Sequence, residues 1–533
     1  QGGLARGGTG VMTDILIGID AGTSVMKSVA FDLGGRQLAM ASIPNSYEAE
    51  GRTGSVQDMA RTWADAAKTL AMLAEKIENL PERVAAIAVT GQGDGNWRIG
   101  RNGEPVGKAW LWLDARSGAV VDRLRADSGD AERYRLTGSG LAACQQGPQL
   151  RWILENEPER LDGVANTFHC KDWLYFKLTG KIATDPSEAC FTFGDFRTRQ
   201  YSNDVIDFLD LQKVRYLLPE IVDGATEHHP LGEEAAKLTG LRAGTPVVLG
   251  YVDVACTALG AGLYDKGVDT GCTIIGSTGM HMRFADNAQD VWLNKDLTGY
   301  TMCLPIPGAY TQMQSNMAAT LNIDWIVNVA AGLLKSMGVE KSKPELLSHV
   351  DLWLAGASER PILFHPYISE AGERGPFVDV SARASFVGLS VGHGFGDLVK
   401  AVFDGLAFSA RDCYEAMGQI PERVRLTGGA ARSAALRSIL GGALNASIQT
   451  SEREEAGAAG AAMIAAVSLG IYDDMEACVT DWVSPYFRPA EAPNPEIVRR
   501  FDQAFPAYRQ TRQALRPVWH MMADDHTQKE LPQ

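Results

Sequence analysis

The feature that most constrains the fold is one pattern that occurs twice in the chain. Residues 18–32, GIDAGTSVMKSVAFD, and residues 269–283, DTGCTIIGSTGMHMR, each contain an aspartate, a strand-like run, a turn of small residues and a second strand-like run. The first copy is no Walker motif, because it has no second glycine and no helical pattern follows it. Two copies about 250 residues apart indicate two related α/β domains, each with one glycine-containing turn.

Turns of this kind can hold anions. Successive backbone N–H groups in a tight turn without bulky side chains can point at one phosphate. An ordinary hairpin is the alternative for either turn alone. A third element, the strand Val424–Thr427 followed by Gly428, Gly429 and a helix, offers bare backbone against which a flat ring such as adenine can lie. The three elements together favour a nucleotide site.

Composition sets the class of the protein. The chain has 533 residues, 45% of them hydrophobic and 22% charged, which predicts two well-buried domains of roughly 250 residues. A net charge of −15 argues against nucleic acid and anionic membranes as partners. No apolar run is long enough for a membrane span, and the eight scattered cysteines have no zinc-site spacing, so we expect a cytoplasmic protein with buried free thiols.

The change of pattern near Lys266 gives the predicted domain boundaries. We expect an N-terminal domain over residues 13–265 and a C-terminal domain over 266–486. Residues 487–533 follow as a proline-rich linker, a helix from Glu496 to about Leu515 and a polar tail. Residues 1–12 are glycine-rich and precede the first strand, which is typical of an expression remnant or a disordered lead.

Several segments together make the pattern specific. These are GIDAGTSVMKSVAFD, CTIIGSTGMHMR, LTGGAARSAALRSILGGAL with REEAGAAGAAMIA, and the long stretch that begins FHPYISEAGERGP. From about Ile15 to about Tyr486 the chain resembles the FGGY family of carbohydrate kinases, in the actin/Hsp70/hexokinase-like superfamily. The resemblance implies an α/β fold of two ribonuclease-H-like domains with a cleft between them. It also implies ATP and Mg²⁺ on the C-terminal side, with a polyol or sugar beneath the γ-phosphate.

Phosphoryl transfer to a hydroxyl needs a proton acceptor, and Asp253 is the candidate base. It lies in VVLGYVDVACTALGAGL, at the position that matches the family's catalytic aspartate. The alternative role is that of a helix cap. Asp20 and Asp253 are expected to contact Mg²⁺ through water and the ATP phosphates.

The two turns and the third glycine element are the expected nucleotide site. Lys27 could neutralise phosphate charge or lie in solvent. The residues that the resemblance implies for ATP binding are Asp20, Gly22, Thr23, Ser24, Lys27, Gly276, Ser277, Thr278, Gly279, Gly428, Gly429, Ala430 and Arg432.

Substrate contacts are expected from the N-terminal domain. Asp94 matches the family's substrate-reading position, while Gly93 stands where glycerol kinases carry an arginine, which argues against a glycerol-like binding mode. In the W.D.R element, Trp112 could pack on the carbon chain and Arg116 could brace Asp114. Core packing, ion pairing and polar loop positions are the alternatives. The expected substrate residues are Asp94, Asn96, Trp112, Asp114, Arg116, Gln145, Gln146 and Asp253.

The resemblance implies an ATP-dependent kinase of a small polyol. The segments GQGDGNW, WLWLDAR and LAACQQGPQLRW most resemble family members that phosphorylate erythritol, so erythritol 4-phosphate is the expected product. Pentulose or pentitol kinases, glycerol kinase and quorum-signal kinases are the alternatives. A non-enzymatic actin-like scaffold would not need Asp253. The expected partners are the polyol, MgATP and a second copy of the chain in a homodimer.

Overall fold

The computed structural model describes residues 13–358 and 361–529, so the expected lead at 1–12 lies outside the described residues. The first half of the chain builds a six-stranded sheet in the order β14-β15-β6-β1-β2-β3. Its strands are β1 (Ile15–Ala21), β2 (Val25–Asp32), β3 (Gln37–Pro44), β6 (Val84–Gly91), β14 (His229–Pro230) and β15 (Pro246–Leu249).

The second half repeats the arrangement of the five strands β3-β2-β1-β6-β15 and adds its sixth strand at the opposite edge. Its sheet has the order β18-β19-β17-β16-β22-β23. β1 and β2, like β16 and β17, form an antiparallel hairpin, and β6 and β22 each run parallel to the first strand of their hairpin. The internal repeat is therefore confirmed. The strands are β16 (Thr270–Ile275), β17 (Gly279–Ala285), β18 (Tyr300–Cys303), β19 (Tyr310–Asn316), β22 (Arg423–Thr427) and β23 (Ser447–Thr450).

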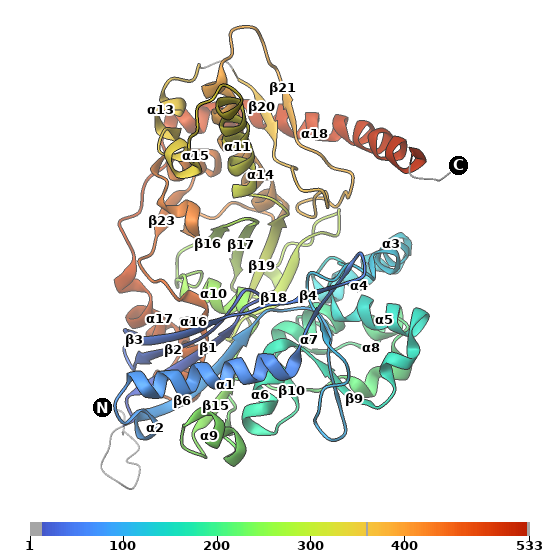
Figure 1. Cartoon of the computed structure of the whole chain (residues 1–533), viewed down its shortest axis with the longest axis vertical. Coiled ribbons are helices and arrows are strands. Elements are labelled where there is room, and N and C mark those ends of the chain that lie inside the picture. The colour runs from blue at the N-terminus through green and yellow to red at the C-terminus, as the bar shows by residue number, and fades with distance from the viewer. Residues whose placement is uncertain (1–12, 359–360, 530–533) are drawn as a thin grey trace.

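Two helices lie between the sheets, α10 (Asp253–Gly260) and α16 (Ala456–Ser468), as Figure 1 shows. Glycines let their backbones touch. A Cβ on Gly260 would lie 2.0 Å from the carbonyl oxygen of Ala456, and one on Gly460 would lie 2.0 Å from that of Cys256. Since α16 also packs on β1 and β6, one continuous core joins both halves of the chain.

The remaining helices cover the outer faces. On the first sheet, α1 (Met59–Lys76) buries the stripe of Met59, Trp63, Ala66, Leu70 and Leu73, as its periodicity predicts. The helices near the first sheet are α2 (Leu80–Arg83), α6 (Cys170–Thr179) and α9 (Glu233–Thr239). A lateral group contains α3 (Gly118–Ala126), α4 (Asp130–Thr137), α5 (Gln146–Asn156), α7 (Pro186–Phe193) and α8 (Asn203–Phe208). The C-terminal half contributes α11 (Thr320–Ser336), α12 (Lys343–Leu347), α13 (Val350–Ala355), α14 (Phe395–Ala416), α15 (Ala434–Leu444) and α17 (Met475–Trp482).

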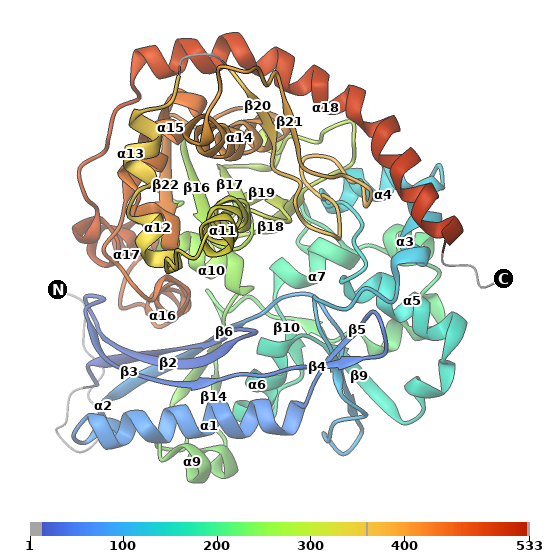
Figure 2. The same cartoon turned by 45° about the horizontal axis from the view of Figure 1, so that its top comes forward.

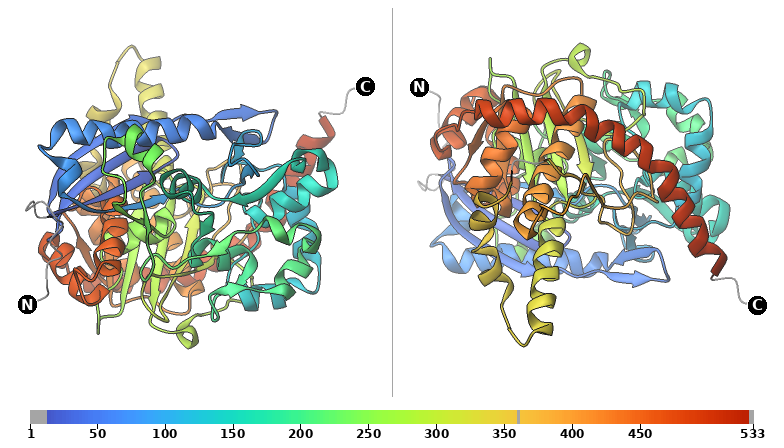
Figure 3. Two further views of the ribbon diagram at one scale, coloured as in Figure 1. Left: turned by 90° about the horizontal axis from the view of Figure 1, so that it is seen from below. Right: turned by 90° about the horizontal axis from the view of Figure 1, so that it is seen from above.

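The C-terminal helix is longer than expected. Instead of ending near Leu515, α18 spans Pro495–Lys529 and continues through Pro517. Trp519 explains the continuation, because its ring is buried against Tyr367 and Phe377. Figure 2 and the right-hand view of Figure 3 show α18 curving over the C-terminal half towards α3.

The structure bears on two further predictions, that the cysteines are buried free thiols and that no segment spans a membrane. All eight cysteines are buried and free, so the expectation of structural thiols is confirmed. Within residues 13–358 and 361–529, none of the helices combines the length and the apolar character that a bilayer crossing demands.

Candidate active site

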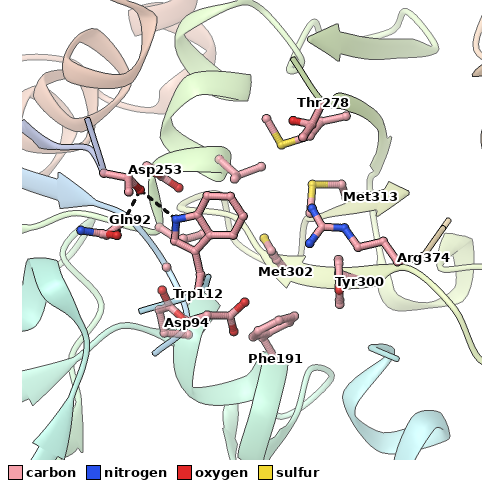
Figure 4. Close-up of a pocket in the computed structure, with 16 residues that line it drawn as sticks. Gln92, Asp94, Trp112, Phe191, Asp253, Thr278, Tyr300, Met302, Met313 and Arg374 are labelled. Atoms are coloured by element: carbon pink, nitrogen blue, oxygen red, sulfur yellow. Dashed lines mark hydrogen bonds between the residues drawn. The ribbon is translucent and has the colours of Figure 1, made fainter. Parts of the chain in front are cut away.

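The two predicted turns and the candidate base meet at one cavity of about 210 Å³. Thr23 comes from the β1–β2 turn, Thr278 from the β16–β17 turn and Asp253 from the start of α10. Figure 4 shows Trp112 in this cavity, with Asp253 and Gln92 on one side and Arg374 on the other. The lining residues are Thr23, Gln92, Gly93, Asp94, Trp112, Glu188, Phe191, Val252, Asp253, Val254, Thr278, Met280, Tyr300, Met302, Met313 and Arg374.

Asp253 follows β15 and is the first residue of α10. Withdrawal from bulk solvent raises the pKa of its carboxyl well above the ordinary value, and the nearby negative charge of Asp20 raises it further. A carboxylate with a raised pKa is a stronger proton acceptor than an exposed aspartate. The side chain is therefore suited to take a proton from a hydroxyl in the cavity.

Asp20 ends the buried run of β1, next to the first turn. Withdrawal from solvent raises the pKa of its carboxyl to about 6, against the opposing effect of the Lys27 charge. The Lys27 ammonium lies 2.8 Å from a carboxylate oxygen of Glu455, just before α16. Lys27 is thus neither free in solvent nor unpaired, and it links the first turn to the C-terminal half.

The second turn is fixed by the start of α11. The backbone N–H of Ala319 donates to the carbonyl of Ser277, and that of Thr320 donates to the carbonyl of Gly276. Gly428 ends β22 beside this turn with φ of 91°, and a Cβ there would lie 2.5 Å from the carbonyl oxygen of Ile275. The third glycine element is consequently adjacent to the second turn, with Gly429, Ala430 and Arg432 in the short helix that follows.

Acidic side chains form the floor of the cavity. Asp94 has a left-handed backbone with φ of 56°, and its Oδ2 accepts a hydrogen bond from the Cys144 thiol at 3.2 Å. Its buried Oδ1 has no hydrogen-bond partner among the residues that the structure describes. Glu188 from α7 is buried, with an unpartnered Oε1 and a pKa that burial raises to about 7. These oxygens are available to a ligand with hydroxyl groups.

Arg374 provides the cationic group of the opposite wall. Its loop, residues 373–379, pairs back on itself between Glu373 and Asp379. One guanidinium nitrogen donates to the Ser315 hydroxyl at 2.8 Å, while Nε has no partner. A buried donor facing carboxylates across a small cavity suits a polyhydroxylated ligand.

Three predicted substrate residues do not line the cavity. Asn96 accepts the Thr167 hydroxyl at 2.6 Å. The Gln145 amide donates to the carbonyl of Gly140, and the Gln146 amide donates to Thr167 Oγ1 and the carbonyl of Phe168. All three side chains are buried and paired within the N-terminal half, away from the cavity residues.

Asp114 and Arg116 also turn away from the cavity. Their side chains pair at 2.6 Å, and Arg116 reaches Glu50 at 2.5 Å. Asp114 lines a second cavity of about 630 Å³, which shares Trp112, Tyr300 and Arg374 with the first. Arg116 braces Asp114 as expected, but the pair lies beside the second cavity and not in the first.

Sequence reasoning missed several lining residues. Arg374 lies in GERGP, within the long stretch that carries the family resemblance, so a motif signal existed for it. Phe191, Met302 and Met313 carried no signal, because apolar residues on a helix and two strands look the same whether they line a site or a core.

Two sheets that share a five-strand arrangement, with two turns and an aspartate at one cavity, are the features of a phosphotransferase with the actin-like ATPase fold. The chain matches the sequence models for the N-terminal domain of the FGGY family of carbohydrate kinases, over residues 15–260, and for its C-terminal domain, over 271–469. The chain belongs to the FGGY family of carbohydrate kinases.

Named relatives and solved structures agree with this assignment. An erythritol kinase of Brucella abortus is 53% identical over 96% of this chain and 98% of its own length. A xylulose kinase of Lactococcus lactis is 28% identical over 96% and 98%. In fold, a xylulose kinase of Lactobacillus acidophilus superposes with a TM-score of 0.85 at 22% identity, covering 95% of this chain and 99% of that one. The glycerol kinase of Plasmodium falciparum with ADP gives 0.80 at 17% identity, covering 94% and 98%.

Proposed function

We propose that this protein transfers the γ-phosphate of MgATP to a terminal hydroxyl of erythritol. The observation that carries the proposal is the single cavity that joins Asp253, both turns and the unpartnered oxygens of Asp94 and Glu188. The 53% identity to a protein named erythritol kinase supports the substrate. Pentulose phosphorylation is the second candidate, supported more distantly by the xylulose kinase relative.

Phosphoryl transfer depends mainly on how the protein positions the reacting groups and stabilises their charge. Asp253 would accept the proton of the attacking hydroxyl, while backbone N–H groups of the two turns would face the phosphates. Asp94 and Glu188 would accept hydrogen bonds from the other hydroxyls, and Arg374 would donate to them. Trp112 and Phe191 would cover the carbon chain and keep water from the reacting groups.

Magnesium fits the residues present. Burial raises the pKa of both Asp20 and Asp253, the charge of Glu455 raises that of Asp20 further, and the charge of Asp20 raises that of Asp253. A divalent cation near these carboxylates would relieve the repulsion. In the described part of the chain, no cluster of three or more acidic, histidine or cysteine side chains could hold a metal alone. We therefore propose that the cation is held through water and phosphate oxygens, where it would neutralise charge on the transferred group.

Glycerol is disfavoured as the substrate by the space around Gly93. A Cβ there would lie 2.5 Å from Val252 Cγ2 and 2.7 Å from Glu188 Oε1. The arginine that glycerol kinases carry at this position would therefore require Val252 and Glu188 to move.

A substrate panel tests the proposal. We expect kcat/KM with MgATP to be highest for erythritol among erythritol, threitol, glycerol, xylitol, D-ribulose and D-xylulose, measured by coupled ADP production. Glycerol should be at least about tenfold poorer, because buried groups that bind the missing hydroxyl would be left unpaired. A clear preference for a pentulose would replace the substrate and leave the kinase activity in place.

The pH profile tests the base. Only the deprotonated carboxylate of Asp253 can accept a proton, so a raised pKa moves the rise of activity to higher pH. We expect kcat/KM for erythritol to increase with pH through the range above about 4, the ordinary pKa of aspartate, and into the neutral region. A rate that is already at its plateau near pH 5 would contradict the raised pKa.

A further inference from the structure

A continuous chain of hydrogen bonds surrounds the first turn and reaches the polyol wall. The indole N–H of Trp112 donates to the Thr23 hydroxyl at 2.8 Å, and that hydroxyl donates to Gln92 Oε1 at 3.1 Å (Figure 4). The Gln92 amide donates to Gln57 Oε1 at 2.9 Å, and the Gln57 amide donates to Asn45 Oδ1 at 2.9 Å. The Asn45 amide closes the chain on the carbonyl of Gly22 at 2.9 Å.

The direction of each bond is fixed by chemistry. An indole N–H only donates, so the Thr23 oxygen must accept from Trp112. The single hydroxyl hydrogen of Thr23 is then the donor to Gln92, and none is left for a phosphate. In this conformation the Thr23 hydroxyl is therefore committed to Gln92.

The chain also fixes the backbone of the turn. Asn45 holds it twice, through its side chain on Gly22 and through its backbone N–H on the carbonyl of Ser24 at 2.8 Å. Gln57 and Gln92 are both buried, 2% exposed each, so their bonds are shielded from water. A change at Trp112 can consequently reach Gly22 through a chain whose middle members, Gln92 and Gln57, are shielded from solvent.

We infer that Trp112 is a positioning residue for the nucleotide as well as a wall of the polyol site. Through Thr23 and the three amides, its indole N–H sets the conformation of the turn whose backbone faces the phosphates. The inference rests on the proposed function. If Trp112 has both roles, binding of a polyol in the cavity and binding of phosphate at the first turn are energetically coupled, because both depend on the orientation of one indole ring.

A double-mutant cycle on nucleotide affinity tests the link. The variants are Trp112→Phe, Thr23→Val and the pair together, and the readout is the Kd of MgATP by calorimetry with no polyol present. We expect each single change to raise Kd about tenfold, because one buried partner is left unpaired. The double variant should bind MgATP no more weakly than Thr23→Val alone, because that change already removes the bond from Trp112 together with the bond to Gln92.

Matched variants separate this role from simple wall packing or misfolding. Thr23→Ser keeps the hydroxyl and should bind MgATP as the unaltered chain does. Met302→Leu alters the same cavity without a bond to the turn, so it should change the KM of the polyol and leave the Kd of MgATP unchanged. Trp112→Phe leaving the Kd of MgATP within twofold, or effects that multiply in the double variant, would overturn the inference.

The outcome is distinguishable from failure of the proposed function. The cycle measures MgATP binding alone, so a wrong polyol would leave its result intact. An unaltered chain that does not bind MgATP would contradict the kinase proposal itself.

Discussion

Replacing Asp253 by asparagine is expected to lower kcat by about 100-fold or more while leaving the Kd of MgATP within a few-fold of the original value. The amide has the same size as the carboxyl, but it cannot accept the hydroxyl proton. Burial and the charge of Asp20 hold the pKa of the Asp253 carboxyl well above its usual value, so the lost group is a strong acceptor. Coupled ADP production gives kcat, and calorimetry gives the Kd.

A matched carboxylate outside the cavity provides the control. Asp265 pairs with Arg425 at 2.5 Å and is not among the cavity residues. Asp265→Asn should leave kcat within twofold. Near-normal turnover of the Asp253→Asn variant would remove Asp253 as the base and would direct attention to Glu188, another carboxyl of the cavity, whose pKa burial raises to about 7.

Replacing Lys171 by methionine is expected to destabilise the fold by about 3–5 kcal/mol, because it leaves buried charges unpaired. The Lys171 ammonium lies 2.5 Å from Asp172 Oδ1 and 2.6 Å from Asp185 Oδ1, and all three side chains are 0% exposed. These two carboxylates raise the pKa of Lys171, so the lysine stays charged. Urea unfolding followed by circular dichroism measures the loss.

The same network reaches the active site. Asp185 Oδ2 accepts the Ser187 hydroxyl at 2.5 Å, and the Ser187 oxygen accepts the backbone N–H of Val252 at 3.1 Å, next to Asp253. We therefore expect Lys171→Met to lower kcat as well. Lys237→Met removes an exposed lysine that pairs with Glu234, so its stability should change by less than about 0.5 kcal/mol. Equal stability of the two variants would contradict the structural role of Lys171.

The sequence alone determined the architecture and singled out Asp253, the candidate base, which lines the cavity. The two turns, the strands that flank them and Asp253 are local patterns, and their spacing carries the repeat that both sheets confirm. Strand and turn signals depend on neighbouring residues, so they are readable without the fold. The family assignment followed from the same segments, because each motif lies within one short stretch of chain.

Tertiary structure alone decided which polar side chains face the cavity. Gln145 and Gln146 have the chemistry of a hydroxyl reader, yet their partners at Gly140 and Phe168 turn them inward. Arg374 reaches the cavity from a loop far along the chain. The sequence also could not predict where α18 ends. The contact that holds the helix beyond Pro517 joins Trp519 to Tyr367, which lies 152 positions earlier in the chain. The direction in which a side chain points, and the group with which it pairs, depend on residues that are distant in sequence and that only folding brings together.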